Sequence, residues 1–184
     1  MNRKMQTMIF SITGLLALGM ILFTGWWFFQ KNQYLPYKNN KKGFSIRYPA
    51  GWEAVETQKG VDVIFKTPTE GTWDNFRENV NLIVQDISQK PMTLEAYSSL
   101  AIDQMQAIFG ENLLIQAAEE VSLAGRPGFK FEYIGKGPDG ELHFRHYWTL
   151  VDSNAYQITY TAMNNSFDQY IDQVEHMIKT FKIQ

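Results

Sequence analysis

The chain has 184 residues, of which 45% are hydrophobic, 15% aromatic and 20% charged, and this composition excludes a largely disordered protein. It contains no cysteine, which excludes disulfides, thiolate metal sites, catalytic thiols and lipidated cysteine anchors. A formal net charge of −2 argues against binding of nucleic acid through a broadly basic surface.

The N-terminal segment from Met8 to Phe29 has no charged residue and few polar ones. As a helix it would be roughly 33 Å long, enough to cross the hydrocarbon core of a bilayer. It ends in Trp26, Trp27 and Phe28 as well as Phe29, and such aromatic residues favour a membrane interface. No Ala-x-Ala-like cleavage site follows. We therefore expect an uncleaved transmembrane helix, a signal anchor in contact with the lipid bilayer; a cleaved signal peptide and a buried core helix are the alternatives.

The positive charges that flank this segment nearly balance, so they orient it weakly. Arg3 and Lys4 precede it, and Lys31 is the nearest basic residue after it. This small excess favours an N-terminus inside the cell. We expect a single-pass protein of the cell membrane with its folded domain on the extracytoplasmic side.

The remaining chain is long enough for one domain. We expect an anchor with its flanks over residues 1–33, a polar stalk over 34–42 and a folded domain over 43–184. Residues 34–184 hold 14 basic and 19 acidic side chains, a net charge of −5. A mildly acidic domain is not expected to bind anionic lipid broadly.

Alternation of apolar and polar residues predicts strands in this domain. The first runs from Phe44 to Tyr48 and ends at Pro49, where turn residues begin. Short Gly-, Pro- and Asn-containing turns separate the later strands, which favours an antiparallel sheet. The further expected strands cover residues 52–57, 61–66, 80–87, 113–123, 129–134, 141–151 and 155–162.

Two segments have helical periodicity. Thr93 is placed to cap the first helix, and Gly110 to end it. Ser166 and Gln169 have the spacing of a capping box at the start of the second. The apolar stripe of the first helix is Leu94, Tyr97, Ala101, Met105 and Ile108; that of the second is Phe167, Tyr170, Ile171, Val174, Met177, Ile178 and Phe181. Strands with two helices predict an α+β fold, an antiparallel sheet flanked by helices.

Several segments carry a resemblance to a known family. They are Gly43-Phe44, Tyr48-Pro49-Ala50-Gly51-Trp52, Val61-Asp62-Val63-Ile64-Phe65 and Glu78-Asn79-Val80-Asn81-Leu82-Ile83-Val84. Together with the Gly-Pro-Asp-Gly hairpin and the closing helix, they resemble PsbP-like proteins: the photosystem II oxygen-evolving extrinsic protein PsbP and its bacterial relatives. The resemblance implies an α/β/α sandwich, here preceded by one transmembrane helix. Physically, the motif from Tyr48 to Trp52 is typical of a folding device, with an aromatic recognition surface as the alternative.

The resemblance also implies a non-enzymatic role. The best-known members help to assemble or stabilise photosystem II on its lumenal face, so the implied partner is a membrane protein complex, and the thylakoid membrane is implied if the host is photosynthetic. Bacterial relatives are often lipoproteins held by an N-terminal cysteine, which this chain lacks. The expected transmembrane helix would replace that lipid.

Catalytic motifs are missing from the sequence: there is no HExxH, no G-x-S-x-G and no phosphate-binding loop. We therefore assign no catalytic, cofactor-binding or metal-binding residue. Glu141, His143 and Arg145 share one face of a predicted strand. Glu141 and His143 could supply two ligands to a metal ion, but a closed site usually needs four. We therefore expect this face to be solvated. His146 lies on the opposite face, and we expect it in the core with a hydrogen-bond partner.

The loop over residues 67–77 carries the strongest binding signal. It is too polar for a strand, yet it contains Trp73, Phe76 and Arg77, residue types that are enriched at the centres of interfaces. We predict that these three residues contact a partner. The alternative is that the rings fold back and plug the end of the sheet.

Two functional classes remain open. The first is a membrane-anchored accessory protein that presents a binding surface to a membrane complex. The second is an extracytoplasmic carrier of a small ligand or lipid. An apolar pocket open to the surface would favour the carrier, whereas a solid core with an exposed loop would favour the binding protein.

Overall fold

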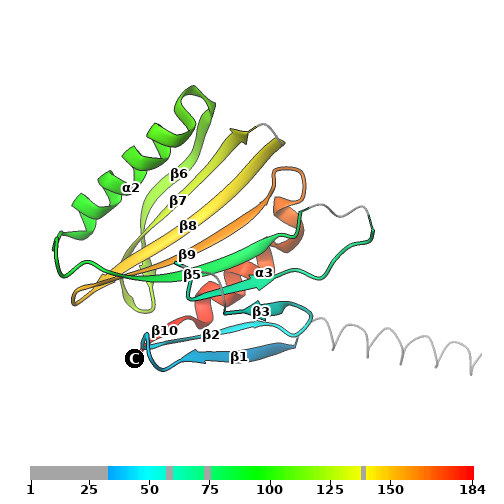
Figure 1. Ribbon diagram of the computed structural model, residues 1–184, viewed down its shortest axis with the longest axis horizontal. Helices are drawn as coiled ribbons and strands as arrows, with labels where there is room; N and C mark the ends of the chain where they lie inside the picture. The colour runs from blue at the N-terminus through cyan, green and yellow to red at the C-terminus, as the bar shows by residue number, and fades with distance from the viewer. Residues whose placement is uncertain (1–32, 57–59, 73–75, 138–139) are drawn as a thin grey trace, which may run out of the picture.

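The computed structural model describes residues 33–56, 60–72, 76–137 and 140–184 (Figure 1). The transmembrane helix expected from Met8 to Phe29 lies outside these residues. Among the helices that the structure describes, none is both long and apolar enough to cross a bilayer.

A seven-stranded antiparallel sheet forms the centre of the fold, in the order β3-β4-β5-β9-β8-β7-β6. Each expected strand of residues 52–162 is present, with shifts of a few residues at the ends. The strands are β3 (Glu53–Val55), β4 (Val63–Lys66), β5 (Asn79–Asp86), β6 (Leu113–Leu123), β7 (Arg126–Gly137), β8 (Gly140–Val151) and β9 (Asn154–Met163).

The sheet consists of two meanders. The first contains β3, β4 and β5; the chain then crosses one face of the sheet as helix α2 (Leu94–Phe109) and the short 3-10 helix η1 (Gly110–Asn112). It returns from the far edge through β6, β7, β8 and β9, until β9 pairs with β5 (Figure 1). Elements far apart in the sequence are thereby joined in one sheet.

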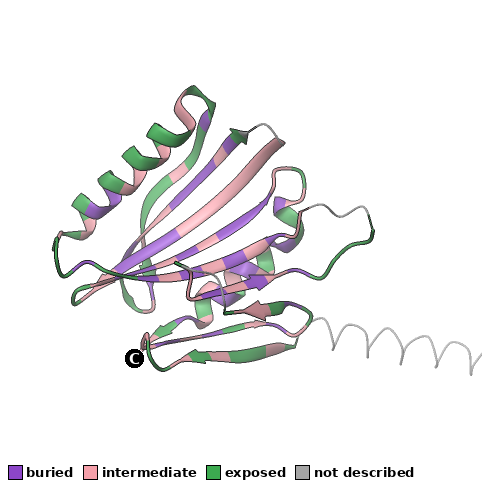
Figure 2. Ribbon diagram, viewed as in Figure 1, coloured by how far each residue is buried: buried purple, intermediate pink, exposed green. Residues whose placement is uncertain are grey.

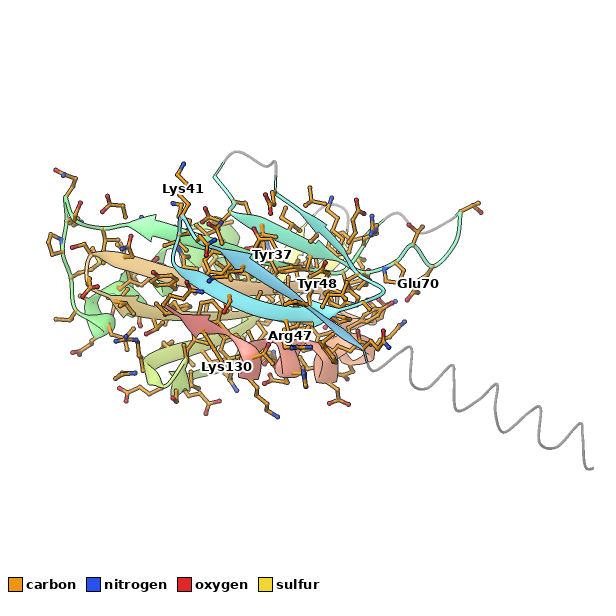
Figure 3. All side chains as sticks on the ribbon, turned by 90° about the horizontal axis from the view of Figure 1, so that it is seen from below. Tyr37, Lys41, Arg47, Tyr48, Glu70 and Lys130 are labelled. Atoms are coloured by element: carbon orange, nitrogen blue, oxygen red, sulfur yellow. The ribbon has the colours of Figure 1, made fainter. Side chains whose placement is uncertain are left out.

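A second, three-stranded sheet contains β1 (Tyr34–Asn39), β2 (Phe44–Pro49) and β10 (Lys182–Ile183). The stalk expected over residues 34–42 is therefore wrong in its first part, because residues 34–39 pair with β2 along its whole length. Tyr37 and Tyr48 of this sheet pack on Phe65 of β4, with ring centroids 5.4 and 4.8 Å apart (Figure 3). These contacts join the small sheet to the large one.

The large sheet separates two hydrophobic cores. On one face α2 covers an aromatic core that includes Phe131, Tyr133 and Trp148. On the other face, helix α3 (Phe167–Thr180) and the small sheet enclose a larger core around Phe44, Val80 and other buried side chains (Figures 1 and 2). Helices on both faces of an antiparallel sheet confirm the expected α+β class.

Trp52 links the motif at the end of β2 to α3. Its ring is 6% exposed and packs edge-on against Tyr170, with the ring centroids 5.8 Å apart. Its indole nitrogen Nε1 donates a hydrogen bond of 3.0 Å to Gln173 Oε1. Trp52 therefore holds α3 in place while Tyr48 packs on β4, which agrees with a folding device.

Helix α2 begins and ends close to the expected residues. The hydroxyl oxygen of Thr93 accepts a hydrogen bond from Ala96 N, and Gly110 follows the last turn with a φ of 55°. Ile108, however, is 66% exposed, although the sequence placed it on the apolar stripe. Phe109, the last residue of the helix, faces the sheet in place of Ile108, and its ring contacts Tyr133.

Helix α3 buries or half-buries the whole apolar stripe expected from the sequence. The predicted capping box is wrong, because the Ser166 side chain makes no capping hydrogen bond to the helix. Its hydroxyl donates instead to Oε1 of Glu78, the residue just before β5. The start of α3 is thus fixed by tertiary contact with β5 and the loop before it.

Gly128 provides a test of how closely β7 packs against its neighbours β6 and β8. A Cβ atom at this position would lie 2.8 Å from the Trp148 carbonyl oxygen and 3.1 Å from Leu123 Cβ, neither of which can move without its strand. We expect Gly128→Ala to lower the free energy of unfolding by about 1–3 kcal/mol, the usual cost of overpacking. Gly51→Ala is the matched control, since a Cβ there meets no atom within 4 Å. Chemical denaturation of both variants measures the difference, and equal stabilities would contradict this account of the packing.

Candidate functional site

Four ionisable side chains gather where α3 crosses β7 and β8, and we call them the ionic cluster: Glu132, His143, Arg145 and Glu175. Glu132 lies on β7 directly opposite Arg145 of β8. His143 is two residues before Arg145 and so points to the same face. Glu175 reaches down from the third turn of α3.

The cluster is a continuous chain of short contacts. Glu132 Oε1 lies 3.0 Å from His143 Nε2, and Glu132 Oε2 accepts a 2.6 Å hydrogen bond from Arg145 Nε. Arg145 also donates from its terminal nitrogen to Glu175 Oε1 at 2.6 Å. The hydroxyl of Tyr147 donates to the same Glu175 oxygen at 2.7 Å. Each charged group is therefore bonded to a partner of opposite charge or to a donor.

Phe167, at the start of α3, covers one side of the cluster. Its ring stacks on the imidazole of His143, with 3.5 Å between centroids, and lies 5.3 Å from the Arg145 guanidinium carbon. A cation over an aromatic face is stabilised by the ring quadrupole. The cluster is thus closed by an apolar side chain on the helix and is largely shielded from water.

Glu132 is the residue whose titration the cluster changes most. Burial alone would raise the pKa of its carboxyl group, but the hydrogen bonds and charges of His143 and Arg145 prevail and lower that pKa to about 2. Burial likewise opposes the charge of Arg145, yet contact with Glu132 raises the pKa of its guanidinium group above the usual value. Both groups stay ionised at neutral pH, so neither is poised to transfer a proton.

The cluster corrects the expectation that Glu141, His143 and Arg145 form a solvated strand face. His143 and Arg145 lie beneath α3, with side chains only 12% and 17% exposed. Glu141, nearer the hairpin, instead accepts a hydrogen bond from Asn164 Nδ2. The face is polar because it carries the ion pairs that hold the helix to the sheet.

Glu132 and Glu175 were not predicted from the sequence as residues of this site. The contact between Glu132 and Arg145 could have been predicted from the β7–β8 hairpin. Gly137 lies opposite Gly140, and the same register, continued along both strands, places Glu132 opposite Arg145. The position of Glu175 could not be found in this way, since it depends on where α3 crosses the sheet.

His146 occupies the other face of β8, beneath α2, as expected. Its Nε2 atom is buried without a hydrogen-bond partner among the described residues. Burial lowers the pKa of the imidazole to about 4, and a side-chain hydrogen bond with Gln157 opposes this shift in part. The ring is therefore neutral at physiological pH and behaves as a core side chain beside Trp148.

The loop over residues 67–77 is fixed where it joins the sheet. Arg77 Nε donates to the Thr67 carbonyl oxygen at 2.6 Å, and the Arg77 guanidinium group also pairs with Glu53 at 2.8 Å. Further along the loop, Glu70 accepts hydrogen bonds from Tyr170 and Gln169 of α3 (Figure 3). Residues 68–72 are exposed between these contacts.

The structure places the three predicted partner-binding residues unequally. Arg77 and Phe76 are half-buried near the base of the loop. Trp73 lies outside the described residues. The choice between partner contact and a plug therefore stays a prediction for these side chains.

Hollows lie beside both helices, and one of about 440 Å³ is bordered by Leu94 and Glu95 of α2 and by Phe129 of β7. A larger one, of about 670 Å³, lies between α3 and the β6–β7 hairpin and is lined by polar and apolar residues that include Lys130, Tyr147 and Glu175. A smaller one, of about 280 Å³, lies under α2 and is bordered by His146 and Gln157. Among the described residues, no group of three or more His, Asp and Glu side chains is arranged to hold a metal ion.

The contribution of Glu132 to stability should depend on pH. Its pKa falls from the ordinary 4.5 to about 2 on folding, so its stabilisation is complete above the ordinary value and disappears as the pH falls toward 2. We expect Glu132→Gln to cost about 3 kcal/mol at pH 7, because it leaves Arg145 buried with one carboxylate fewer. The loss should shrink at low pH.

Denaturation curves from pH 7 down to pH 2.5 measure this effect. Glu119→Gln is the control, since Glu119 pairs with Lys130 but is 55% exposed, and we expect it to cost less than about 1 kcal/mol. A Glu132→Gln variant as stable as the parent at pH 7 would show that the cluster does not hold α3 on the sheet.

The sequence was compared with known proteins. The model of the PsbP family matches residues 32–183. One relative is PsbP-like protein 1, chloroplastic, of Arabidopsis thaliana, which is 21% identical over 156 residues. The alignment covers 83% of this chain and 66% of the Arabidopsis protein, so the chain spans just under two thirds of that relative.

Solved structures share the fold at low sequence identity. Cyanobacterial PsbP (CyanoP) of Synechocystis sp. PCC 6803 superposes with a TM-score of 0.60 at 19% identity, covering 82% of this chain and 92% of that one. LpqN of Mycobacterium tuberculosis, described as involved in cell envelope biogenesis, gives 0.59 at 11% identity, covering 83% and 91%. PA94 of Pseudomonas aeruginosa, a protein of unknown function, gives 0.58 at 13%, covering 81% and 96%. These likenesses establish the fold alone.

Proposed function

This chain belongs to the PsbP family, and on that premise we propose that it is a membrane-anchored accessory protein that binds, assembles or stabilises a membrane protein complex. In a photosynthetic host that complex would be photosystem II. PsbP-like proteins are generally non-enzymatic accessory proteins. The anchor would be the segment from Met8 to Phe29, with the domain on the extracytoplasmic or lumenal side.

The anchored loop over residues 67–77 is the observation that carries the proposal. Arg77 closes the loop at its base, and Glu70 ties its middle to Tyr170 of α3, while residues 68–72 stay exposed. A loop held at fixed points loses less conformational entropy when it binds a partner than a free loop does. Tethering at a membrane would also raise the effective concentration near a membrane complex, so modest affinity suffices.

The chemistry of the ionic cluster also supports a binding role. A general acid or base needs a pKa near the working pH, but the pKa of Glu132 is about 2 and its oxygens are engaged by His143 and Arg145. The cluster is better suited to fixing α3 on the sheet than to catalysis.

The alternative, a carrier of a small ligand or lipid, needs an enclosed apolar pocket. In the described part of the chain, aromatic side chains such as Phe131 and Trp148 occupy the centre of the space between α2 and the sheet. The hollows of about 670, 440 and 280 Å³ beside the helices are each bordered in part by charged side chains. These observations favour the binding protein over the carrier.

The anchor leads to a prediction about membrane extraction. We expect the full chain to resist alkaline carbonate and to be released only by detergent, because a helix of about 20 apolar residues remains in the bilayer. A chain lacking residues 8–29 is the control and should be released by carbonate. Recovery of a mature protein that begins after Phe29 would contradict the uncleaved anchor.

The loop leads to a prediction about partner capture. If Trp73 and Phe76 contact the partner, the double variant Trp73→Ala/Phe76→Ala should weaken capture of the complex from detergent-solubilised membranes by about 2 kcal/mol or more, as at a binding hot spot. Its melting temperature should stay close to that of the parent. The control, Leu35→Ala/Leu100→Ala, removes two exposed apolar side chains elsewhere and should leave capture unchanged.

Melting curves measured beside capture distinguish the two roles of the loop. A plug would cost roughly 3–5 kcal/mol of stability for each ring removed, as for aromatic side chains deleted from a core. A large fall in melting temperature would therefore reject the binding role, and unchanged melting with unchanged capture would reject both roles.

A further inference from the structure

The two edges of the seven-stranded sheet are built differently. β3 forms one edge and has only three residues, Glu53–Val55. β6 forms the other edge and has eleven, Leu113–Leu123, paired with β7 on one side only. A long edge strand presents unpaired backbone N–H and C=O groups to which another strand can pair.

β6 lacks most of the devices that protect edge strands. The edge strand β1 of the small sheet contains Pro36 and Lys38, and β10 has two residues, whereas β6 contains neither proline nor lysine. Its one interruption is a bulge at Gln116, between Ile115 and Ala117. Residues 117–123 then continue in regular register with β7. Among the described edge strands, β6 alone has a regular stretch as long as residues 117–123 without proline, lysine or a bulge.

Exposed apolar side chains gather at the start of this edge. Leu114 and Ile115 are 52% and 51% exposed, and Ile108, just before η1, is 66% exposed. Most of β6 is coloured as exposed in Figure 2, unlike β8 and β9. Although α2 lies beside β6, Leu114 and Ile115 stay exposed, so apolar area remains available for contact.

The charges beside the edge select what can pair with it. Glu119 is neutralised by Lys130 at 2.5 Å, but Glu120 has no ion pair among the described residues. Glu120 and Glu95 of α2 border one hollow of about 440 Å³ on the α2 face. On a strand paired with the outer edge of β6, the residue opposite Glu120 would point to the α2 face. Its side chain would enter this hollow between the Glu120 and Glu95 carboxylates.

We propose that the outer edge of β6 binds an extended segment of the partner by strand addition, with a lysine or arginine of that segment between Glu120 and Glu95. Apolar residues of the segment would cover Leu114 and Ile115. Backbone hydrogen bonds supply affinity in this mode, and the side-chain pockets supply specificity. The proposal rests on the proposed function, since it describes one contact with the partner complex.

A second copy of this chain is a poorer occupant. The regular part of the edge, residues 117–123, is centred on Glu120. Symmetric antiparallel pairing about that centre would place Glu120 opposite its own copy, and like charges directly opposite each other are destabilising. The edge is therefore complementary to a basic strand and not to itself.

The experiment uses the full chain in neutral detergent and two synthetic peptides, one of alternating valine and lysine and one of alternating valine and glutamate. Fluorescence titration measures their binding, and hydrogen exchange measures protection of the amides of residues 117–123. A third probe is the valine–lysine peptide with N-methyl groups along one edge, which keeps the charges but cannot form the strand pairing.

We expect the valine–lysine peptide to bind and to slow exchange in residues 117–123, and the N-methylated peptide to bind much more weakly. Glu120→Lys should weaken binding of the valine–lysine peptide about five- to tenfold, because an opposite-charge pair becomes a like-charge pair, and should strengthen that of the valine–glutamate peptide. Asp103→Lys changes the net charge equally on α2, away from the hollow, and should leave both affinities unchanged.

Three results would overturn the proposal. They are equal binding of the N-methylated peptide, an equal effect of Asp103→Lys, and no added protection in residues 117–123. Protection that rises with protein concentration without peptide, together with a dimer in sedimentation, would assign the edge to a second copy instead. Peptide binding is measured without the complex, so its failure is distinguishable from a failure of capture through the loop over residues 67–77.

Discussion

The pairing of β5 with β9 joins two meanders that would otherwise be separate sheets. It extends over eight residue pairs, from Asn79 opposite Thr161 to Asp86 opposite Asn154. Val80 and Ile158, one from each strand, are fully buried. Both helices depend on this pairing. It makes the sheet continuous from β5 to β6, the two strands that α2 connects. On the other face, α3 covers the region where the two meanders meet.

The two faces of the sheet hold their helices by different means. Under α2 the contacts are aromatic, and the buried Trp148 donates a hydrogen bond of 2.8 Å to Ser98 of the helix. Under α3 an apolar core is continued toward β7 by the ionic cluster around Glu132 and Arg145. Apolar packing tolerates small shifts, whereas short hydrogen-bonded ion pairs require a defined geometry. The cluster is therefore suited to fixing the rotation and height of α3.

A rigid centre explains why candidate binding features lie at the periphery. The ionisable groups beneath α3 are engaged with one another, while the loop over residues 67–77 and the edge of β6 remain accessible. These two features lie at opposite sides of the seven-stranded sheet, since the loop leaves β4 beside β3 and β6 is the far edge. A partner complex could therefore be contacted through either feature or both.

The sequence by itself determined the elements whose signals are local. Alternation located the strands of the large sheet, helical spacing located α2 and α3, and the motif from Tyr48 to Trp52 pointed to the family. Local patterns succeed here because burial on one face imposes a period of two or 3.6 residues. Residues 34–39 were missed as a strand because proline and lysine on an edge strand also suit a polar linker.

Only the tertiary structure decided which residues meet across the fold. Ser166 has a capping sequence, yet its hydroxyl donates to Glu78, because a buried carboxylate requires a hydrogen-bond donor. Glu175 faces Arg145 because α3 crosses the sheet at that point, and β6 is an edge because β9 pairs with β5. Such long-range pairings depend on the packing of whole elements, and no local period in the sequence encodes them.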